Sequence, residues 1–156
     1  MKRILLLCTG NTCRSPMAQA FLQRMLDEAG VEAQVNSAGI FAANGHPASE
    51  NAVKVMQEYG LDLSEHRSRP LTLEMLQQSD LILAMEAKQV QQLASLSDNF
   101  KTKIHTLKGY ARGVDEFPGG GYDVMDPFMG DIEVYRKCAA QIKKFLEQAL
   151  PRIKDI

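Results

Sequence analysis

The chain has 156 residues, of which 45 % are hydrophobic and 24 % charged, and its formal net charge is −1 at pH 7. This composition is typical of a soluble globular protein, and we expect one domain spanning residues 1–156. A charge so near zero argues against nucleic acid or an anionic membrane surface as the main partner. No apolar run has the length of a membrane span or a secretory signal, and the three cysteines then indicate a reducing compartment, so we expect a cytoplasmic protein.

The apolar residues 4–7 predict a buried strand, which a polar loop joins to an amphipathic helix. We expect Ser15 to cap this helix, with Pro16 at its first position and the end near Gly30. The first N–H groups of a helix have no partner within it, so a loop entering a helix in this way is suited to binding an anion.

The loop holds the residue types that phosphoryl chemistry requires. Cys8 is a candidate nucleophile, and Arg14 offers a planar pair of donors that matches two phosphoryl oxygens. Gly10 and Asn11 tolerate left-handed backbone conformations, so the loop can turn its N–H groups inward around an anion. Those N–H groups and the Ser15 hydroxyl would also stabilise a thiolate at Cys8. No G-K-[ST] sequence follows the glycine, which excludes a nucleotide-binding P-loop.

The rest of the chain alternates between predicted strands and helices. Further strands are expected at residues 33–37, 81–85 and 103–107. Further helices are expected at residues 47–59, 73–78, 86–96 and 132–153. Residues 108–128 are expected to form a long loop with a glycine hinge at residues 119–121. This alternation predicts an α/β fold with a parallel sheet covered on both faces, whose ligand site lies beyond the carboxyl ends of the strands, where Cys8 is.

The segment C-T-G-N-T-C-R-S-P-M-A, residues 8–18, resembles the C-x5-R signature of the low-molecular-weight protein tyrosine phosphatase family. The resemblance extends to S-A-G at 37–39, H-R-S at 66–68, D-P-F at 126–128 and the overall length, so it covers essentially the whole chain. It implies a three-layer α/β domain with a four-stranded parallel sheet, flavodoxin-like strand order 2-1-3-4 and about five helices. It also implies a metal-free, cofactor-free protein phosphatase with a phosphocysteine intermediate.

The resemblance assigns three catalytic residues. Cys8 is expected to attack phosphorus, Arg14 to bind the phosphoryl oxygens, and Asp126 to act as general acid and then as general base. Asp126 is preferred to the nearby Asp123 and Asp131 because it belongs to the D-P pair typical of the family.

The resemblance also assigns residues that bind phosphate or support the loop. The remaining phosphate-binding loop residues are Thr9, Gly10, Asn11, Thr12, Cys13 and Ser15. Ser37 and His66 are expected to hydrogen-bond Asn11 and Ser15 and so to keep the loop rigid.

Cysteine usage implies redox sensitivity. Family members with a cysteine at the position of Cys13 close a reversible disulfide to the nucleophile, here Cys8. The alternative, that Cys13 is only a packed loop residue, stays open because spacing does not fix the distance between the sulfurs. Cys138 is expected to be structural. The scattered histidines and the lack of a paired C-x2-C set predict no metal site.

The expected substrate depends on the walls of the pocket. Tyrosine-specific members usually have a bulky aliphatic residue at the position of Thr12 and a tyrosine at that of Phe128, so this chain resembles the bacterial protein-arginine-phosphatase branch. Thr12 would admit a polar guanidino group, with Phe128 and Phe41 forming the pocket sides. We therefore favour protein phosphoarginine over phosphotyrosine as substrate. The expected partners are phosphorylated proteins or peptides, with inorganic phosphate as product and competitive ligand.

Three other classes of protein share part of this pattern. Arsenate reductases that are coupled to thioredoxin need a further cysteine pair, and residues 81–96 contain no cysteine. Phosphocysteine carrier domains of sugar transport lack the loop arginine and the acid, which are present here. A phosphoprotein-binding module without activity is disfavoured because no residue of the expected catalytic set is missing.

Overall fold

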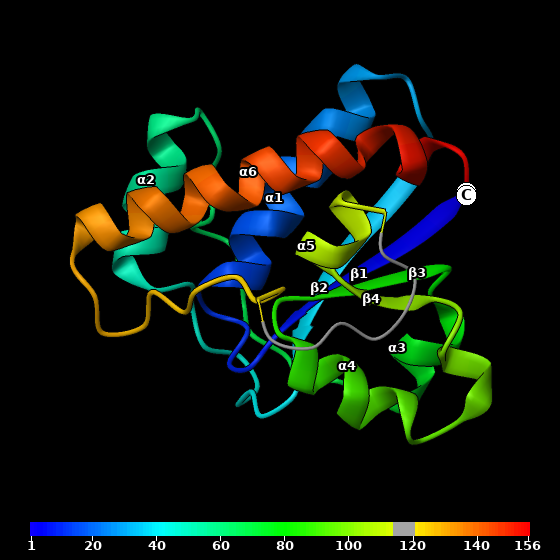
Figure 1. The fold of residues 1–156 in the computed structure, drawn as a ribbon. Coiled ribbons are helices and arrows are strands. Elements are labelled where there is room, and N and C mark those ends of the chain that lie inside the picture. Colours follow the sequence, from blue (N-terminus) through cyan, green and yellow to red (C-terminus); the bar gives the residue numbers. More distant parts are fainter. Residues whose placement is uncertain (114–120) are drawn as a thin grey trace.

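In the computed structural model, which describes residues 1–113 and 121–156, four strands form one parallel sheet of order β2-β1-β3-β4 (Figure 1). The strands are β1 (Lys2–Cys8), β2 (Ala33–Gly39), β3 (Leu81–Ala84) and β4 (Ile104–Thr106). All three strand pairings are parallel. This architecture confirms the predicted α/β fold and its strand order.

Six α-helices and a short 3₁₀ helix lie in the described part of the chain. They are α1 (Arg14–Glu28), α2 (Glu50–Glu58), α3 (Leu73–Gln78), α4 (Ala87–Ala94), the 3₁₀ helix Asp98–Phe100, α5 (Leu107–Ala111) and α6 (Ile132–Lys154). In the described ranges, no helix combines the length and the apolar character needed to cross a bilayer.

The extra helix, α5, occupies the start of the segment that was predicted to be loop. Thr106 caps it by accepting a hydrogen bond from Gly109 N, and Leu107 and Tyr110 are buried beneath it. Five residues are too few to give a helical repeat in sequence, so the pattern did not reveal it. Residues 114–120, which include most of the predicted glycine hinge, lie outside the described residues.

The helices cover both faces of the sheet (Figure 1). Side chains of α1, α2, α5 and α6 pack over one face, and those of α3 and α4 pack over the other. Successive residues of a strand point to opposite faces, so Ile4 and Leu6 belong to the first cluster and Leu5 and Leu7 to the second. Burial on both faces explains why β1 reads as an unbroken apolar run.

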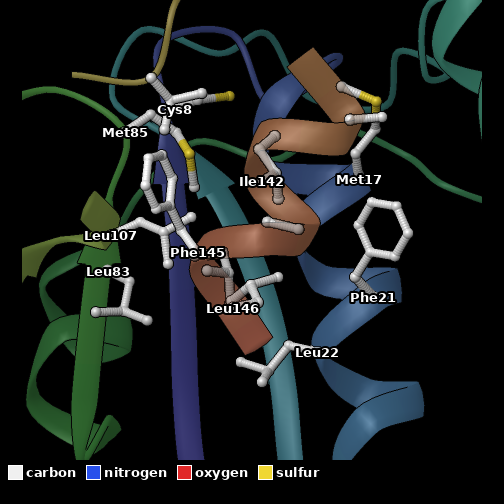
Figure 2. Close-up of a cluster of buried hydrophobic side chains, with 14 of the residues drawn as sticks. Cys8, Met17, Phe21, Leu22, Leu83, Met85, Leu107, Ile142, Phe145 and Leu146 are labelled. Carbon is white, nitrogen blue, oxygen red and sulfur yellow. The ribbon is translucent and has the colours of Figure 1, made fainter. Parts of the chain in front are cut away.

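The larger cluster reaches up to the carboxyl end of β1. Figure 2 shows Cys8 at the top of this cluster, above Leu83 of β3 and Leu107 of α5, with Ile142 of α6 in the same cluster. The nucleophile candidate is therefore held on a strand whose position is fixed by packing on both faces.

Two helix starts differ from the prediction. Helix α2 begins at Glu50 rather than at Pro47, because Ser49 is its cap and accepts from Ala52 N at 3.4 Å. Helix α1 begins at Arg14, one residue before the Ser15 that was expected to cap it. The Ser15 hydroxyl bonds to side chains of the preceding loop instead, so its predicted role as a cap is wrong.

Candidate active site

The Cys8 sulfur lies at the N-terminus of α1, inside the turn of the loop. Its Sγ is hydrogen-bonded to Ser15 Oγ at 2.9 Å and accepts from the backbone N–H of Asn11 at 3.2 Å. Asn11 has a φ of 57°, the left-handed conformation expected of it, which turns this N–H toward the sulfur. The sulfur thus lies against two hydrogen-bonding groups and the N-terminal end of α1, where the helix dipole is positive.

Asn11 is fully buried and ties the loop to its surroundings. Its Nδ2 donates to Ser15 Oγ at 2.8 Å and to Ser37 Oγ at 2.9 Å, and its Oδ1 accepts from Arg69 N at 3.0 Å. Its carbonyl oxygen is 2.7 Å from His66 Nε2. The structure thus brings Ser37 and His66 onto Asn11, while the expected link to Ser15 runs through the Asn11 amide.

Gln19 extends this network along α1. Ser37 Oγ donates to Gln19 Oε1 at 2.6 Å, and Gln19 Nε2 donates to Val35 O at 3.1 Å. The Gln19 amide nitrogen donates to Val35 O, so its oxygen faces Ser37 and accepts the Ser37 hydroxyl proton. The Ser37 oxygen is then free to accept from Asn11 Nδ2.

Arg14 is buried, with only 2 % of it exposed, and hydrogen bonds hold its guanidinium in place. Its Nη1 donates to Val124 O at 2.9 Å, and its Nη2 donates to Glu86 Oε2 at 2.9 Å and lies 3.5 Å from Asp126 Oδ2. Burial acts to lower the pKa of Arg14, but Cys8, Glu86 and Asp126 together outweigh it and raise the pKa above its ordinary value. The guanidinium is therefore a fixed positive charge beside the sulfur.

The N-terminal end of α4 supports both the arginine and the loop. Gln89 is buried, and its Nε2 donates to Thr9 Oγ1 at 3.2 Å and to Glu86 Oε2 at 3.4 Å. Its Oε1 accepts from Glu86 N at 3.2 Å. Sequence reasoning missed Glu86 and Gln89, although Glu86 follows closely on the buried strand β3, at the sheet edge where ligand sites form.

A pocket of about 210 Å³ opens above the sulfur. Its lining comprises Cys8, Thr9, Gly10, Thr12, Cys13, Arg14, Asp126 and Phe128. Phe128 stands at its mouth with 67 % of its surface exposed. Among the described residues, Phe41 is not part of this lining, and it is 75 % exposed. Its backbone N–H donates to Thr9 O at 3.0 Å, beside the loop, and its role as a pocket side stays a prediction.

The three neighbouring aspartates have different surroundings. Asp123 Oδ1 accepts from Ala87 N at 2.7 Å, and Asp131 Oδ1 caps α6 by accepting from Val134 N at 3.1 Å. Asp126 alone of the three lines the pocket, with its side chain about half exposed and facing Arg14. This placement favours Asp126 over the other two as the acid.

The second loop cysteine lies against α6. Cys13 Sγ is 3.2 Å from Tyr135 OH and 3.6 Å from Ser49 Oγ. Burial and the thiol raise the pKa of Tyr135 to about 12, so the phenol stays protonated and available as a donor to sulfur. In residues 1–113 and 121–156 all three cysteines are free thiols, and a disulfide between Cys8 and Cys13 stays a prediction.

The thiol of Cys138, in α6, is 1 % exposed, and burial raises its pKa to about 12. It is therefore a protonated, packed side chain, with its Sγ 3.6 Å from Met125 O. In the same described ranges, no cluster of three His, Cys, Asp or Glu side chains is arranged to hold a metal ion.

The state of His66 predicts a pH dependence of stability. Burial, with help from the charges of Arg69 and Arg67, lowers the pKa of His66 below its ordinary value of 6.5, against the opposing hydrogen bond to Asn11. The unfolded chain then binds the proton more readily than the folded chain. The stability contributed by neutral His66 is present above about pH 6.5 and is lost as the pH falls through the folded-state pKa.

We expect His66→Gln to flatten the decline in the free energy of unfolding between about pH 7 and about pH 5.5, measured by urea denaturation. His46→Gln is the matched control, since the His46 side chain is exposed. An identical decline in wild type and His66→Gln would contradict the assignment.

Comparison with known proteins identifies the family. The model of the low molecular weight phosphotyrosine protein phosphatase family matches residues 3–155. A protein-arginine-phosphatase of Bacillus subtilis (strain 168) is 37 % identical over 151 residues, which cover 97 % of this chain and 96 % of that protein. A probable low molecular weight protein-tyrosine-phosphatase, EpsP of Ralstonia nicotianae, is 36 % identical over 156 residues, which cover 100 % and 99 %.

A solved structure shows the same architecture. The YwlE arginine phosphatase, in a mutant with a phosphorylated active site serine, matches with a TM-score of 0.87 and 37 % identity, covering 97 % of this chain and 95 % of that one. Matches of this identity over almost the whole length show that the chain belongs to the low molecular weight phosphotyrosine protein phosphatase family and is a hydrolase of that family.

Proposed function

We propose that this protein is a cysteine-dependent protein phosphatase that forms a phosphocysteine intermediate and acts preferentially on phosphoarginine. One observation carries the proposal: Cys8 and Arg14, at the two ends of the loop between β1 and α1, and Asp126, from a distant part of the chain, line the same small pocket. A nucleophile, a fixed cation and a carboxylate are the groups that metal-free phosphoryl transfer requires.

In the first step the Cys8 thiolate attacks phosphorus in line with the leaving group. Arg14 and the inward-facing N–H groups of the loop bind the equatorial oxygens and the charge that they carry. Asp126, protonated, gives its proton to the leaving nitrogen or oxygen as the bond to phosphorus breaks. Ser15 and Asn11, which touch the sulfur, stabilise the thiolate before the attack.

In the second step Asp126 is a carboxylate and takes a proton from a water molecule that attacks the phosphocysteine. The sulfur–phosphorus bond breaks, inorganic phosphate forms, and Cys8 returns as a thiolate. Asp126 has regained its proton and is ready for the next substrate.

Two observations support phosphoarginine as the substrate. Thr12, with a short polar side chain, lines the pocket beside the nucleophile, and the Asp126 carboxyl group can accept a hydrogen bond from a guanidino group with one oxygen while the other protonates the leaving nitrogen. Relatives that match over nearly the whole chain include a protein-arginine-phosphatase. A probable tyrosine phosphatase is almost as similar, which makes phosphotyrosine the second candidate.

The test compares kcat/KM on a phosphoarginine peptide and a phosphotyrosine peptide. We expect wild type to favour phosphoarginine and Thr12→Ile to shift the ratio toward phosphotyrosine by about 10-fold or more, because added apolar bulk opposes a polar group but not a ring. Thr102→Ile, in an exposed turn, is the matched control.

The possible outcomes separate the two candidate substrates. A wild-type preference for phosphotyrosine would overturn phosphoarginine as the substrate. A preference for phosphoarginine that Thr12→Ile leaves unchanged would remove Thr12 as the selecting residue.

A further inference from the structure

We propose that Asp123 is a positioning residue, which anchors the segment carrying Asp126 to the N-terminus of α4 and so sets the place of the general acid. The inference rests on the proposed function, because it assigns Asp126 that role. Its central contact is the hydrogen bond from Ala87 N to Asp123 Oδ1, at 2.7 Å.

The partner of Asp123 is a group that needs an acceptor. Ala87 is the first residue of α4, so its N–H has no acceptor within the helix. The helix N-terminus also carries partial positive charge, which favours a carboxylate there. Asp123 therefore gains both a short hydrogen bond and a favourable charge interaction at one defined point.

The next residue along the chain is fixed by the same part of the fold. Val124 N donates to Met85 O at 2.8 Å, and Val124 O accepts from Arg14 Nη1 at 2.9 Å. Val124 is 1 % exposed. Residues 123 and 124 thus join the acid segment to the end of β3, to the start of α4 and to the catalytic arginine.

Asp126 lies only two residues after Val124, and its own side-chain contacts restrain its position less than the backbone contacts of Val124 do. Its Oδ1 accepts from Phe128 N, within the same turn, at 3.0 Å, and its Oδ2 lies 3.5 Å from Arg14. The side chain is 49 % exposed. Its position over the pocket therefore depends on the anchored backbone before it.

The downstream end of the segment has a separate anchor. Asp131 caps α6, and Gly130 N donates to Pro127 O at 2.8 Å in the intervening turn. Asp126 thus lies between an upstream anchor on α4 and a downstream anchor on α6. Loss of the upstream anchor would let Asp126 move relative to the nucleophile, and small displacements of a catalytic group reduce rate strongly.

The experiment uses two substrates that differ in their need for an acid. Phenyl phosphate has a basic leaving group that must be protonated, whereas 2,4-dinitrophenyl phosphate has one that leaves unaided. The ratio of their kcat/KM values is measured, because kcat/KM reports the first phosphoryl transfer and not the later hydrolysis that both substrates share.

We expect Asp123→Ala to lower kcat/KM for phenyl phosphate by about 10-fold or more while changing the value for 2,4-dinitrophenyl phosphate little. Asp123→Asn keeps an oxygen that can accept from Ala87 N, so it should recover most of the loss. Asp80→Ala is the matched control, since Asp80 Oδ2 accepts from Arg3 N at 2.8 Å before β3, at the opposite end of the sheet. It removes a similar bond and should not change the ratio.

A second arm tests whether Asp123 acts through Asp126. In the Asp126→Asn background, Asp123→Ala should cause no further loss on phenyl phosphate. Equal losses on both substrates, or full additivity of the two substitutions, would overturn the inference. If Asp126→Asn selectively loses activity on phenyl phosphate and Asp123→Ala does not, only the positioning role fails. If Asp126→Asn itself keeps the wild-type ratio, the general-acid role in the proposed function fails.

Discussion

Replacement of Cys8 with serine will lower phosphatase turnover by about 10⁶-fold, the order of loss seen when an enzyme loses its nucleophile. Cys8 Sγ contacts Ser15 Oγ at 2.9 Å and Asn11 N at 3.2 Å, which are groups that the proposed mechanism uses to stabilise a thiolate. A serine hydroxyl has a far higher pKa, and these same donors do not ionise it. The measurement is kcat on p-nitrophenyl phosphate, with binding of inorganic phosphate followed by calorimetry.

The loss should be confined to chemistry. Arg14 and the loop N–H groups remain, so inorganic phosphate should still bind to Cys8→Ser. Cys138→Ala is the matched control because it removes a buried thiol outside the pocket lining, and its kcat should stay near that of wild type. Wild-type turnover in Cys8→Ser would remove Cys8 as nucleophile and the phosphocysteine with it.

The second largest effect is expected from Asp126→Asn, which should reduce kcat/KM on phosphoarginine and phenyl phosphate substrates by about 10²–10⁴-fold. Asparagine keeps the Oδ1 that accepts from Phe128 N, so the turn is preserved while the exchangeable proton is lost. The inhibition constant of inorganic phosphate should change much less than the rate. Steady-state kinetics with phosphate as competitive inhibitor measures both.

Asp131→Asn is the control for this substitution. Asp131 lies five residues after Asp126 in the same segment and caps α6 through Val134 N, a bond that asparagine can also accept. Its kinetics should resemble wild type. If Asp131→Asn lost more activity than Asp126→Asn, the two aspartates would have to exchange roles.

The fold could be predicted because its signals are local. Residues 4–7 and 81–84 are buried on both faces of the sheet and read as apolar runs, while α6 has a long apolar stripe at helical spacing. The strand order came from resemblance to a family. Helix α5 was missed because its five residues include only two buried ones of large size, Leu107 and Tyr110.

The loop could be predicted for the same reason, since Cys8 to Ser15 are contiguous and each residue type suits an anion site. Contacts from distant segments could not. Glu86 meets Arg14 across 72 residues, and Arg69 meets Asn11 across 58. Neither residue belongs to a motif with the loop. Whether Phe41 contacts a bound substrate stays a prediction, because nothing in its sequence neighbourhood fixes which way a ring on a turn will face.

The bonds that hold Arg14 and Asn11 have a thermodynamic consequence for recognition. Arg14 is bound by Val124 O and Glu86, and Asn11 by groups from two other segments, β2 and the connection between α2 and α3. The conformational entropy lost in ordering both side chains is therefore lost during folding. When an oxyanion binds, these two side chains are already ordered, so binding does not incur the entropy cost of ordering them. In the proposed phosphatase this favourable term is common to every phosphoryl ester or amide. Discrimination among substrates would then depend on other side chains that line the pocket, and we predict Thr12 and Phe128 for that role.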